Sequence, residues 1–193
     1  GGQILFTPGD IVYSSSKILE NTLPNLSIEK LNLLMNKHQI SFNDLRRVVN
    51  KFSKIKIHVV GDTIIDTYTR TNFIGGQTKT PTFSVLYDSH EDFVGGAGIV
   101  AKHLSSAGAD VTFTTVLGDD KFKKFVLEEM KKFKIKINAL IDDTRPTTNK
   151  NSIIASNYRL LKLDTLDNRA ISSHFEKKIS NFIKNNKIEA IIF

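Results

Sequence analysis

The sequence contains no cysteine. Disulfide bonds and thiolate metal sites are therefore excluded, and nothing requires an oxidising compartment. No apolar run approaches the roughly 18 residues of a membrane span, and the N-terminus lacks the charged and then apolar pattern of a secretion signal. A G-x-x-x-x-G-K-[ST] segment is also missing, which excludes a P-loop kinase. We expect a cytoplasmic protein without a membrane partner.

The composition is that of one globular domain, or of one domain with an appended piece. Of the 193 residues, 40% are apolar and 24% are charged, which is typical of a soluble chain with a sizeable core. The net charge of +7 comes mostly from lysine. The lysines alternate with apolar residues at helical spacing and no platform of aromatic and arginine residues occurs, so a solvated helix face is favoured over nucleic-acid binding. An anionic substrate such as a sugar phosphate also suits this charge. None of the five histidines lies at metal-ligand spacing from another, and no metal site is expected.

The first part of the chain carries signals for helix starts. Ser14, Ser15 and Ser16 precede an apolar run, and hydroxyl groups at such a position accept hydrogen bonds from the free amides of a first helical turn. Further on, Ser41-Phe42-Asn43-Asp44 has the spacing of a capping box with the shorter acid. Apolar residues then recur at helical spacing, so we predict two helices within residues 27–53.

From residue 55 onward the pattern alternates between strands and helices. Runs of β-branched and apolar residues predict strands, and apolar residues about one helical turn apart predict helices. The expected elements are a strand at 55–60, antiparallel strands within 67–94, a helix at 97–107, a strand at 110–117, a helix starting near 122, a strand at 135–141, an antiparallel pair within 147–163, a helix at 172–186 and a strand at 188–193. This order predicts a doubly wound α/β domain that carries a flap of β-ribbons. Because a parallel strand normally has neighbours beyond it, a strand at the last residue leads us to expect that the chain is cut there.

A glycine-rich segment, Gly95-Gly96-Ala97-Gly98, stands at the start of the helix expected at 97–107. Glycine lets backbone N–H groups at a helix start come close to a ligand, because no Cβ stands in the way. The segment therefore indicates a small-molecule site. One alternative is an NAD(P)-dependent Rossmann oxidoreductase, since residues 96–101 fit G-x-G-x-x-A and Asp119 follows at a suitable distance. Against it, that fingerprint should close the first strand of its unit, whereas the best first strand here ends at Gly61-Asp62.

Three motifs stand in a fixed order: Val59-Val60-Gly61-Asp62-Thr63-Ile64-Ile65-Asp66, then the glycine-rich segment, then Arg145-Pro146-Thr147-Thr148-Asn149-Lys150 with Arg159-Leu160-Leu161-Lys162-Leu163-Asp164. In this order they resemble the PfkB (ribokinase-like) carbohydrate kinases, and in particular the kinase domain of bifunctional heptose 7-phosphate kinase/nucleotidyltransferases. The resemblance implies the N-terminal half of a ribokinase-like doubly wound sheet with a β-ribbon lid. It also implies transfer of the γ-phosphoryl group of ATP, with Mg²⁺, to a hydroxyl of a sugar or of a sugar phosphate such as a heptose 7-phosphate.

The resemblance also assigns residues to the sugar site. Its substrate-binding positions are Asp62, Asp66, Gly95, Gly96, Lys150 and Arg159. A carboxylate such as Asp66 accepts hydrogen bonds from sugar hydroxyls, the backbone of the two glycines can lie flat beneath the sugar, and the two basic residues can meet a substrate phosphate. Taken alone, the residues leave simpler interpretations open: Asp62 can be a turn residue, the glycines a tight turn, and Lys150 and Arg159 solvated charges.

A second resemblance lies at the N-terminus, where residues 1–5 and 13–19 are similar to the closing strand and helix start of a cytidylyltransferase-like domain. In that family the hydroxyl-rich turn lies beside the nucleotide phosphates, which would make Ser14, Ser15 and Ser16 phosphate contacts; a plain serine cap is the alternative. The expected division is residues 1–23 as the tail of a nucleotidyltransferase domain, 24–54 as a helical linker, and 55–193 as the N-terminal half of the kinase domain.

The family pattern is not fully matched. The helix after the two glycines usually carries an asparagine that contacts the sugar, and that position falls on Ile99. The family's catalytic aspartate and ATP contacts lie in a C-terminal half that is absent here. We therefore expect no catalytic residue in this chain, no tightly bound cofactor and no turnover by it alone. A non-enzymatic alternative is a binding or dimerisation module, because the lid ribbon of such kinases often pairs across a homodimer.

Overall fold

The computed structural model describes residues 26–75, 82–186 and 188–193, and it divides after Val48 into two units that we consider separately. Two helices, α2 (Leu26–His38) and α3 (Phe42–Lys51), lie where the sequence predicts them, and the short helix η1 (Phe52–Lys54) follows. The predicted capping box is confirmed. The Asp44 amide donates to Ser41 Oγ over 3.2 Å, and the Ser41 amide donates to Asp44 Oδ2 over 2.8 Å.

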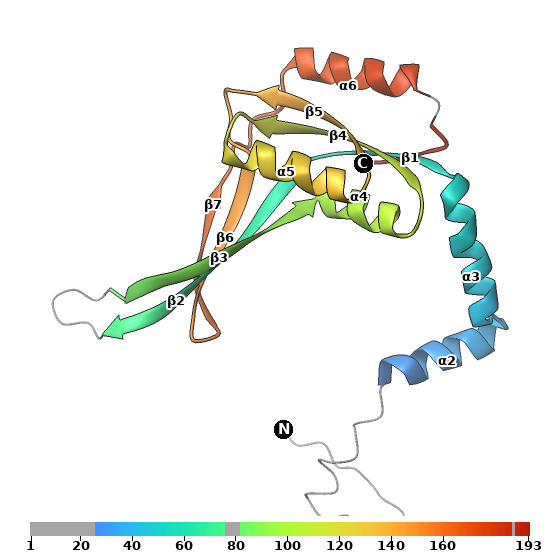
Figure 1. The fold of residues 1–193 in the computed structure, drawn as a ribbon, viewed down its shortest axis with the longest axis horizontal. Helices are drawn as coiled ribbons and strands as arrows, with labels where there is room; N and C mark the ends of the chain where they lie inside the picture. Colours follow the sequence, from blue (N-terminus) through green and yellow to red (C-terminus); the bar gives the residue numbers. More distant parts are fainter. Residues whose placement is uncertain (1–25, 76–81, 187) are drawn as a thin grey trace, which may run out of the picture. The chain divides into compact units, whose positions relative to one another are not determined.

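The larger unit is built on a parallel sheet with the strand order β5-β4-β1-β8. Its strands are β1 (Lys56–Val60), β4 (Asp110–Gly118), β5 (Lys136–Asp142) and β8 (Ala190–Ile192). Its helices are α4 (Ala97–Ser106), α5 (Lys121–Lys132) and α6 (Ser173–Asn185). Figure 1 shows α4 and α5 on one face of this sheet and α6 on the other. The predicted α/β architecture is confirmed.

The hydrophobic core lies between the sheet and the helices α4 and α5. Alternate residues of β1, Ile57 and Val59, point into it, and Phe113 of β4 joins them with no exposed surface. From α5, Val126 and Met130 are equally buried. A strand between two covered faces buries side chains of both faces, and each large apolar side chain buried in this way contributes about 1.5–3 kcal/mol to folding.

The other face of β1 buries a histidine against α6. His58 is fully buried, and its Nε2 lies 2.8 Å from Thr114 Oγ1. Its ring meets the ring of Phe182 edge-on, with 5.4 Å between the centroids. Burial disfavours the charged imidazolium and lowers the pKa of His58 below its ordinary value. The ring is therefore a neutral part of the packing between sheet and helix.

A second sheet forms the lid, with the order β3-β2-β6-β7. Its strands are β2 (Thr63–Gly75), β3 (Ser84–Gly96), β6 (Thr148–Ala155) and β7 (Tyr158–Thr165). Only Gly61 and Asp62 separate β1 from β2, and α4 begins directly after β3. The lid thus grows from the carboxyl end of the parallel sheet and extends away from it (Figure 1). The expected ribbons are confirmed, with the difference that β3 continues through both glycines.

Polar side chains connect three strands of the lid on one of its faces. Asn149 of β6 donates to Thr67 Oγ1 of β2 over 2.7 Å, and Thr67 donates to Asp92 Oδ1 of β3 over 2.5 Å. At the base of the same face, Ile65 and Val94 enter the hydrophobic core. This face of the lid is therefore occupied by structural contacts.

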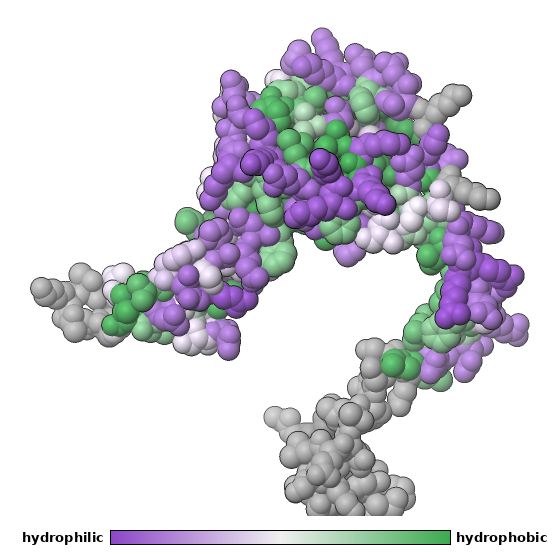
Figure 2. Space-filling view, viewed as in Figure 1, coloured by the Kyte–Doolittle hydropathy of each residue, from purple (hydrophilic) through white to green (hydrophobic). Residues whose placement is uncertain are grey.

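The lysine-rich helix α5 is a solvated surface helix. Figure 2 shows hydrophilic surface over this part of the molecule. Lys123 pairs with Asp119 one turn away, and Lys132 pairs with Glu129, so much of the basic charge is matched locally. Asp120 caps the helix by accepting from the Phe122 amide over 3.0 Å. No helix within the described residues is long and apolar enough to cross a membrane.

Candidate functional site

The site lies where the lid meets the carboxyl ends of the parallel strands. An open hollow there is lined by Asp62 after β1, Val116 near the end of β4, Arg145 after β5 and Thr148 at the start of β6. Chain segments between β7 and α6 complete it, including Ala170. In α/β proteins, ligands bind in the crevice outside the carboxyl ends of the strands, at the point where the strand order reverses. The hollow lies at the carboxyl ends of β1 and β4, and the strand order reverses at β1, where β4 lies on one side and β8 on the other.

The turn between β1 and β2 is locked onto the start of α4. The Ala97 amide donates to the Asp62 carbonyl over 2.9 Å. Gly96 has a φ of 59°, and a Cβ at this position would lie 2.5 Å from the same carbonyl oxygen. Only glycine fits such a backbone position without strain. Gly96 therefore supports the turn, whereas the exposed side chain of Asp62 lines the hollow.

Asp66 lies directly over the bare backbone of Gly95. A Cβ built on Gly95 would collide with Asp66 Oδ2, and the carbonyl of Ile64 would be 3.5 Å away. The carboxylate thus occupies the space that a side chain at residue 95 would fill. The structure thus brings together Asp66 and Gly95, two of the residues that the family resemblance assigns to the sugar site, and their role in binding stays a prediction.

Strand register places two more side chains on the same face as Asp66. Lys150 of β6 is its partner on one side, and Phe93 of β3 is its partner on the other. Directly paired residues point to the same face, with Cβ atoms about 4.5–5.5 Å apart in an antiparallel pair. In the described part of the chain, the Asp66 carboxylate accepts no hydrogen bond and the Lys150 ammonium has no ion-pair partner. Thr148 lies two residues before Lys150 in β6, on the same face and nearer the parallel sheet, and it also lines the hollow.

The structure does not bring Arg159 to this group. Arg159 pairs with Ile154 near the far end of the β6–β7 hairpin. That is four residues along β6 from Lys150, or about 13 Å at 3.3 Å per residue. Gly98 also has a structural position, because a Cβ there would collide with Val94 of the core. The predicted phosphate contacts Ser14, Ser15 and Ser16 lie outside the described residues.

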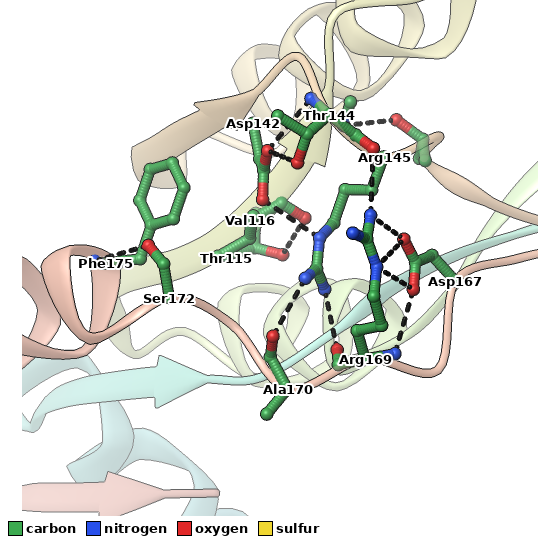
Figure 3. Close-up of polar contacts among 12 residues, drawn as sticks. Thr115, Val116, Asp142, Thr144, Arg145, Asp167, Arg169, Ala170, Ser172 and Phe175 are labelled. Carbon is green, nitrogen blue, oxygen red and sulfur yellow. Dashed lines mark hydrogen bonds and ion pairs between the residues drawn. The ribbon is translucent and has the colours of Figure 1, made fainter.

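A network of arginines and aspartates holds one wall of the hollow (Figure 3). Arg145 Nε lies 3.0 Å from Asp142 Oδ2, while its two terminal nitrogens donate to the carbonyls of Arg169 (3.1 Å) and Ala170 (3.0 Å). Arg169 in turn donates to Asp167 through Nε and Nη2, and to the Thr144 carbonyl. The loop after β5 and the loop before α6 are therefore fastened together across the hollow.

Hydrogen bonds and ion pairs lower the pKa values of both carboxylates of this network. Hydrogen bonds from Arg169, first from its side chain and then from its backbone, lower the pKa of Asp167 to about 2. For Asp142, the Thr144 hydroxyl is the main cause of a lowered pKa, with a bond of 2.6 Å, and Arg145 adds to it. Charge-assisted bonds of this kind are stronger than neutral ones. The network is thus intact at neutral pH.

No sequence pattern indicated a role for Arg169, Asp167 or Asp142, and Arg145 was identified only as part of a motif. One signal was available, because Asp142 closes the strand β5 and Arg145 follows it at the carboxyl edge where ligands bind. No comparable signal exists for Asp167 and Arg169, which lie in a polar stretch without periodicity. Their contacts with the loop after β5, through Arg145 and the Thr144 carbonyl, join residues more than twenty positions apart in the chain.

The fold is an α/β domain whose β-sheet lid stands beside an open hollow at the carboxyl ends of the parallel strands. The model of the pfkB family of carbohydrate kinases matches residues 54–192. The chain belongs to the pfkB carbohydrate kinase family.

Among curated proteins, the chain is 35% identical over 135 residues to the bifunctional protein HldE of Campylobacter jejuni, covering 67% of this chain and 28% of that protein. It is 27% identical over 143 residues to the HldE protein of Pelobacter propionicus, covering 74% and 29%. The chain therefore spans less than a third of the length of these relatives.

Solved structures show the same fold. The phosphofructokinase-2 of Escherichia coli superposes with a TM-score of 0.53 at 13% identity, over 71% of this chain and 43% of that one. The ribokinase of Giardia lamblia gives 0.50 at 17% identity, over 71% and 44%. The ribokinase-like architecture is therefore confirmed.

The Rossmann alternative does not fit this geometry. The fingerprint glycines would have to follow the first parallel strand, but Gly96 ends the antiparallel lid strand β3. The kinase family implies ATP and Mg²⁺ for the full enzyme. Within the described residues, no group of three or more His, Asp or Glu side chains is placed to hold a metal ion.

Proposed function

We propose that this chain is the acceptor-binding part of a sugar kinase that phosphorylates a heptose 7-phosphate or a closely similar sugar phosphate. The observation that carries the proposal is the position of the Asp66 carboxylate over the bare backbone of Gly95, with Lys150 as its register neighbour. The similarity to the HldE proteins supports the heptose as the sugar.

Each residue has a separate task in this proposal. Asp66 accepts hydrogen bonds from two sugar hydroxyls and fixes the orientation of the ring. The main chain at Gly95 and Gly96 lies beneath the sugar, and Lys150 meets its phosphate. Asp62 reaches the sugar from the hollow side. Phosphoryl transfer depends mostly on such positioning and on charge neutralisation, and a lid that closes over the substrate excludes water.

We further propose that the complete protein is bifunctional. Residues 1–23 would then end a nucleotidyltransferase domain, with Ser14, Ser15 and Ser16 near its nucleotide phosphates, residues 24–54 would form a linker, and residues 55–193 would begin the kinase. The complete kinase would use ATP in the cytoplasm and supply the proton acceptor from residues that this chain does not contain. By itself, the chain would bind the sugar phosphate without phosphorylating it.

The lid is also proposed to pair two copies of the protein. Its edge strand β7 exposes Leu161 and Leu163, which are 52% and 57% exposed. Unpaired edge strands with apolar side chains favour association with another sheet. Light scattering on the purified chain should give the mass of a dimer, and Leu163→Lys should give the mass of a monomer.

Calorimetric titration with heptose 7-phosphate tests the binding proposal. The wild-type chain should bind, and Asp66→Asn should weaken binding at least tenfold, because a charge-assisted hydrogen bond contributes about 1.5–3 kcal/mol. The matched control is Asp88→Asn, which removes the same charge from an exposed position of the same lid. Equal affinities for the two variants would refute the role of Asp66. ATP consumption by the wild-type chain alone would refute the assignment of the proton acceptor to residues outside it.

A further inference from the structure

Three side chains of different chemistry lie in one row across the lid. Phe93 of β3, Asp66 of β2 and Lys150 of β6 are consecutive register partners on the same face. Neighbouring strands lie about 4.8 Å apart. The carboxylate thus has an aromatic ring on one side and an ammonium group on the other.

Phe93 is exposed, whereas the next residue along β3 is buried on the opposite face. The side chain of Val94 is 2% exposed and that of Phe93 is 51% exposed. Its ring does not move freely, because it meets the ring of Tyr68 edge-on, with 5.8 Å between centroids and an interplanar angle of 75°. An edge-to-face contact of this type restrains the ring while the residue stays about half exposed. The ring is therefore a fixed and solvent-facing aromatic surface beside Asp66.

We propose that Phe93 is a platform for the sugar ring and selects cyclic sugar phosphates over open-chain ones. The inference rests on the proposed function and adds a residue that determines its specificity. A pyranose ring has polar hydroxyls at its rim and an apolar face of C–H groups. That face packs on an aromatic ring, while a neighbouring carboxylate takes the hydroxyls and an ammonium takes the phosphate.

This arrangement predicts a particular selectivity. The reduced sugar, a heptitol 7-phosphate, keeps the phosphate and the hydroxyls but has no ring face. It should use Asp66 and Lys150 as the cyclic sugar does, and it should gain little from Phe93. Removal of the aromatic ring should therefore reduce the preference for the cyclic ligand rather than weaken all ligands equally.

The experiment measures the affinities of heptose 7-phosphate and of the corresponding heptitol 7-phosphate by calorimetry. The variants are Phe93→Ala, Phe93→Leu and Phe93→Tyr in the full chain. The matched control is Phe83→Ala, because Phe83 is also exposed (64%) and also forms an edge-to-face pair at 5.8 Å, with Phe73. It lies ten residues from Phe93, which is about 33 Å along an extended strand. Circular dichroism confirms that each variant folds, and Phe93→Leu retains apolar bulk if Phe93→Ala does not.

Phe93→Ala and Phe93→Leu should lose five- to tenfold in affinity for the cyclic ligand and less than twofold for the heptitol. Phe93→Tyr should restore the preference, and Phe83→Ala should leave both affinities unchanged. Equal losses for the two ligands, or no loss in either variant, would overturn the role of Phe93 while leaving the proposed function in place. If the wild-type chain binds neither ligand, the proposed function fails, and the inference fails with it.

Discussion

The same substitution at the two adjacent glycines of the site should affect different properties, stability at one position and binding at the other. A methyl group on Gly96 meets backbone atoms, 2.5 Å from the Asp62 carbonyl and 3.2 Å from the Ile64 amide nitrogen, at a φ of 59°. A methyl group on Gly95 meets the far end of the Asp66 side chain instead. Gly96→Ala should therefore damage the fold, whereas Gly95→Ala should damage the binding site.

The magnitudes follow from which atoms can move. For Gly96→Ala, an unfavourable backbone conformation costs about 1–3 kcal/mol and overpacking costs about as much again. The sum corresponds to a fall in Tm of roughly 5–15 °C for a chain of this size. For Gly95→Ala, rotating Asp66 away costs about 0.5–1.5 kcal/mol. Gly95 has no positive φ, so alanine fits its backbone conformation. Alanine also restricts the unfolded chain, which raises the free energy of unfolding by about 0.4–1 kcal/mol. Stability should then change by less than about 1 kcal/mol.

Thermal unfolding followed by circular dichroism gives the stability, and titration with heptose 7-phosphate gives the affinity. We expect Gly95→Ala to retain its Tm within a few degrees and to bind at least tenfold more weakly, because the displaced carboxylate loses charge-assisted bonds to the sugar. Tight binding by Gly95→Ala would contradict the placement of Asp66 over the sugar site. A Tm for Gly96→Ala equal to that of the wild type would contradict the strain assigned to the turn.

Three further perturbations test other parts of the structure. The pKa of His58 is lowered in the folded state, so the folded chain binds fewer protons than the unfolded chain. The free energy of unfolding should therefore fall as the pH drops below about 6.5. Denaturant unfolding of His58→Gln should show a smaller fall over the same pH range. The pKa of Asp167 is about 2 in the folded state, against an ordinary value of 3.8. Its carboxylate therefore stabilises the fold above pH 3.8, and this contribution is lost as the pH falls toward 2. An acid-unfolding curve of Asp167→Asn identical to that of the wild type would refute this contribution. Lys150→Met should weaken the binding of heptose 7-phosphate about tenfold and that of the unphosphorylated heptose much less, whereas Lys124→Met, which removes an equal charge from an exposed position on α5, should alter neither affinity.

Much of the fold was predictable because its signals are local. The capping box at Ser41 and Asp44 needs only four residues, and it forms as expected. The β1 strand and the α5 helix follow from apolar periodicity, which reports which face of an element is buried. The start of β2 was missed: the antiparallel strands were expected from residue 67, whereas β2 begins at Thr63, because Gly61 and Asp62 alone form the turn after β1.

The sequence by itself determined the kinds of element, their order and the family motifs, since periodicity, caps and glycines act over a few residues. The tertiary structure alone decided which of the candidate residues meet. Asp66 and Lys150 are 84 residues apart and become neighbours only through the parallel pairing of β2 with β6, whereas Arg159, in the same motif region, is carried to the far end of the hairpin. Arg145 likewise donates to the carbonyl of Arg169 only because the loop after β5 and the loop before α6 meet beside the hollow. Strand register and loop closure depend on burial across the whole domain, and no short stretch of sequence contains that information.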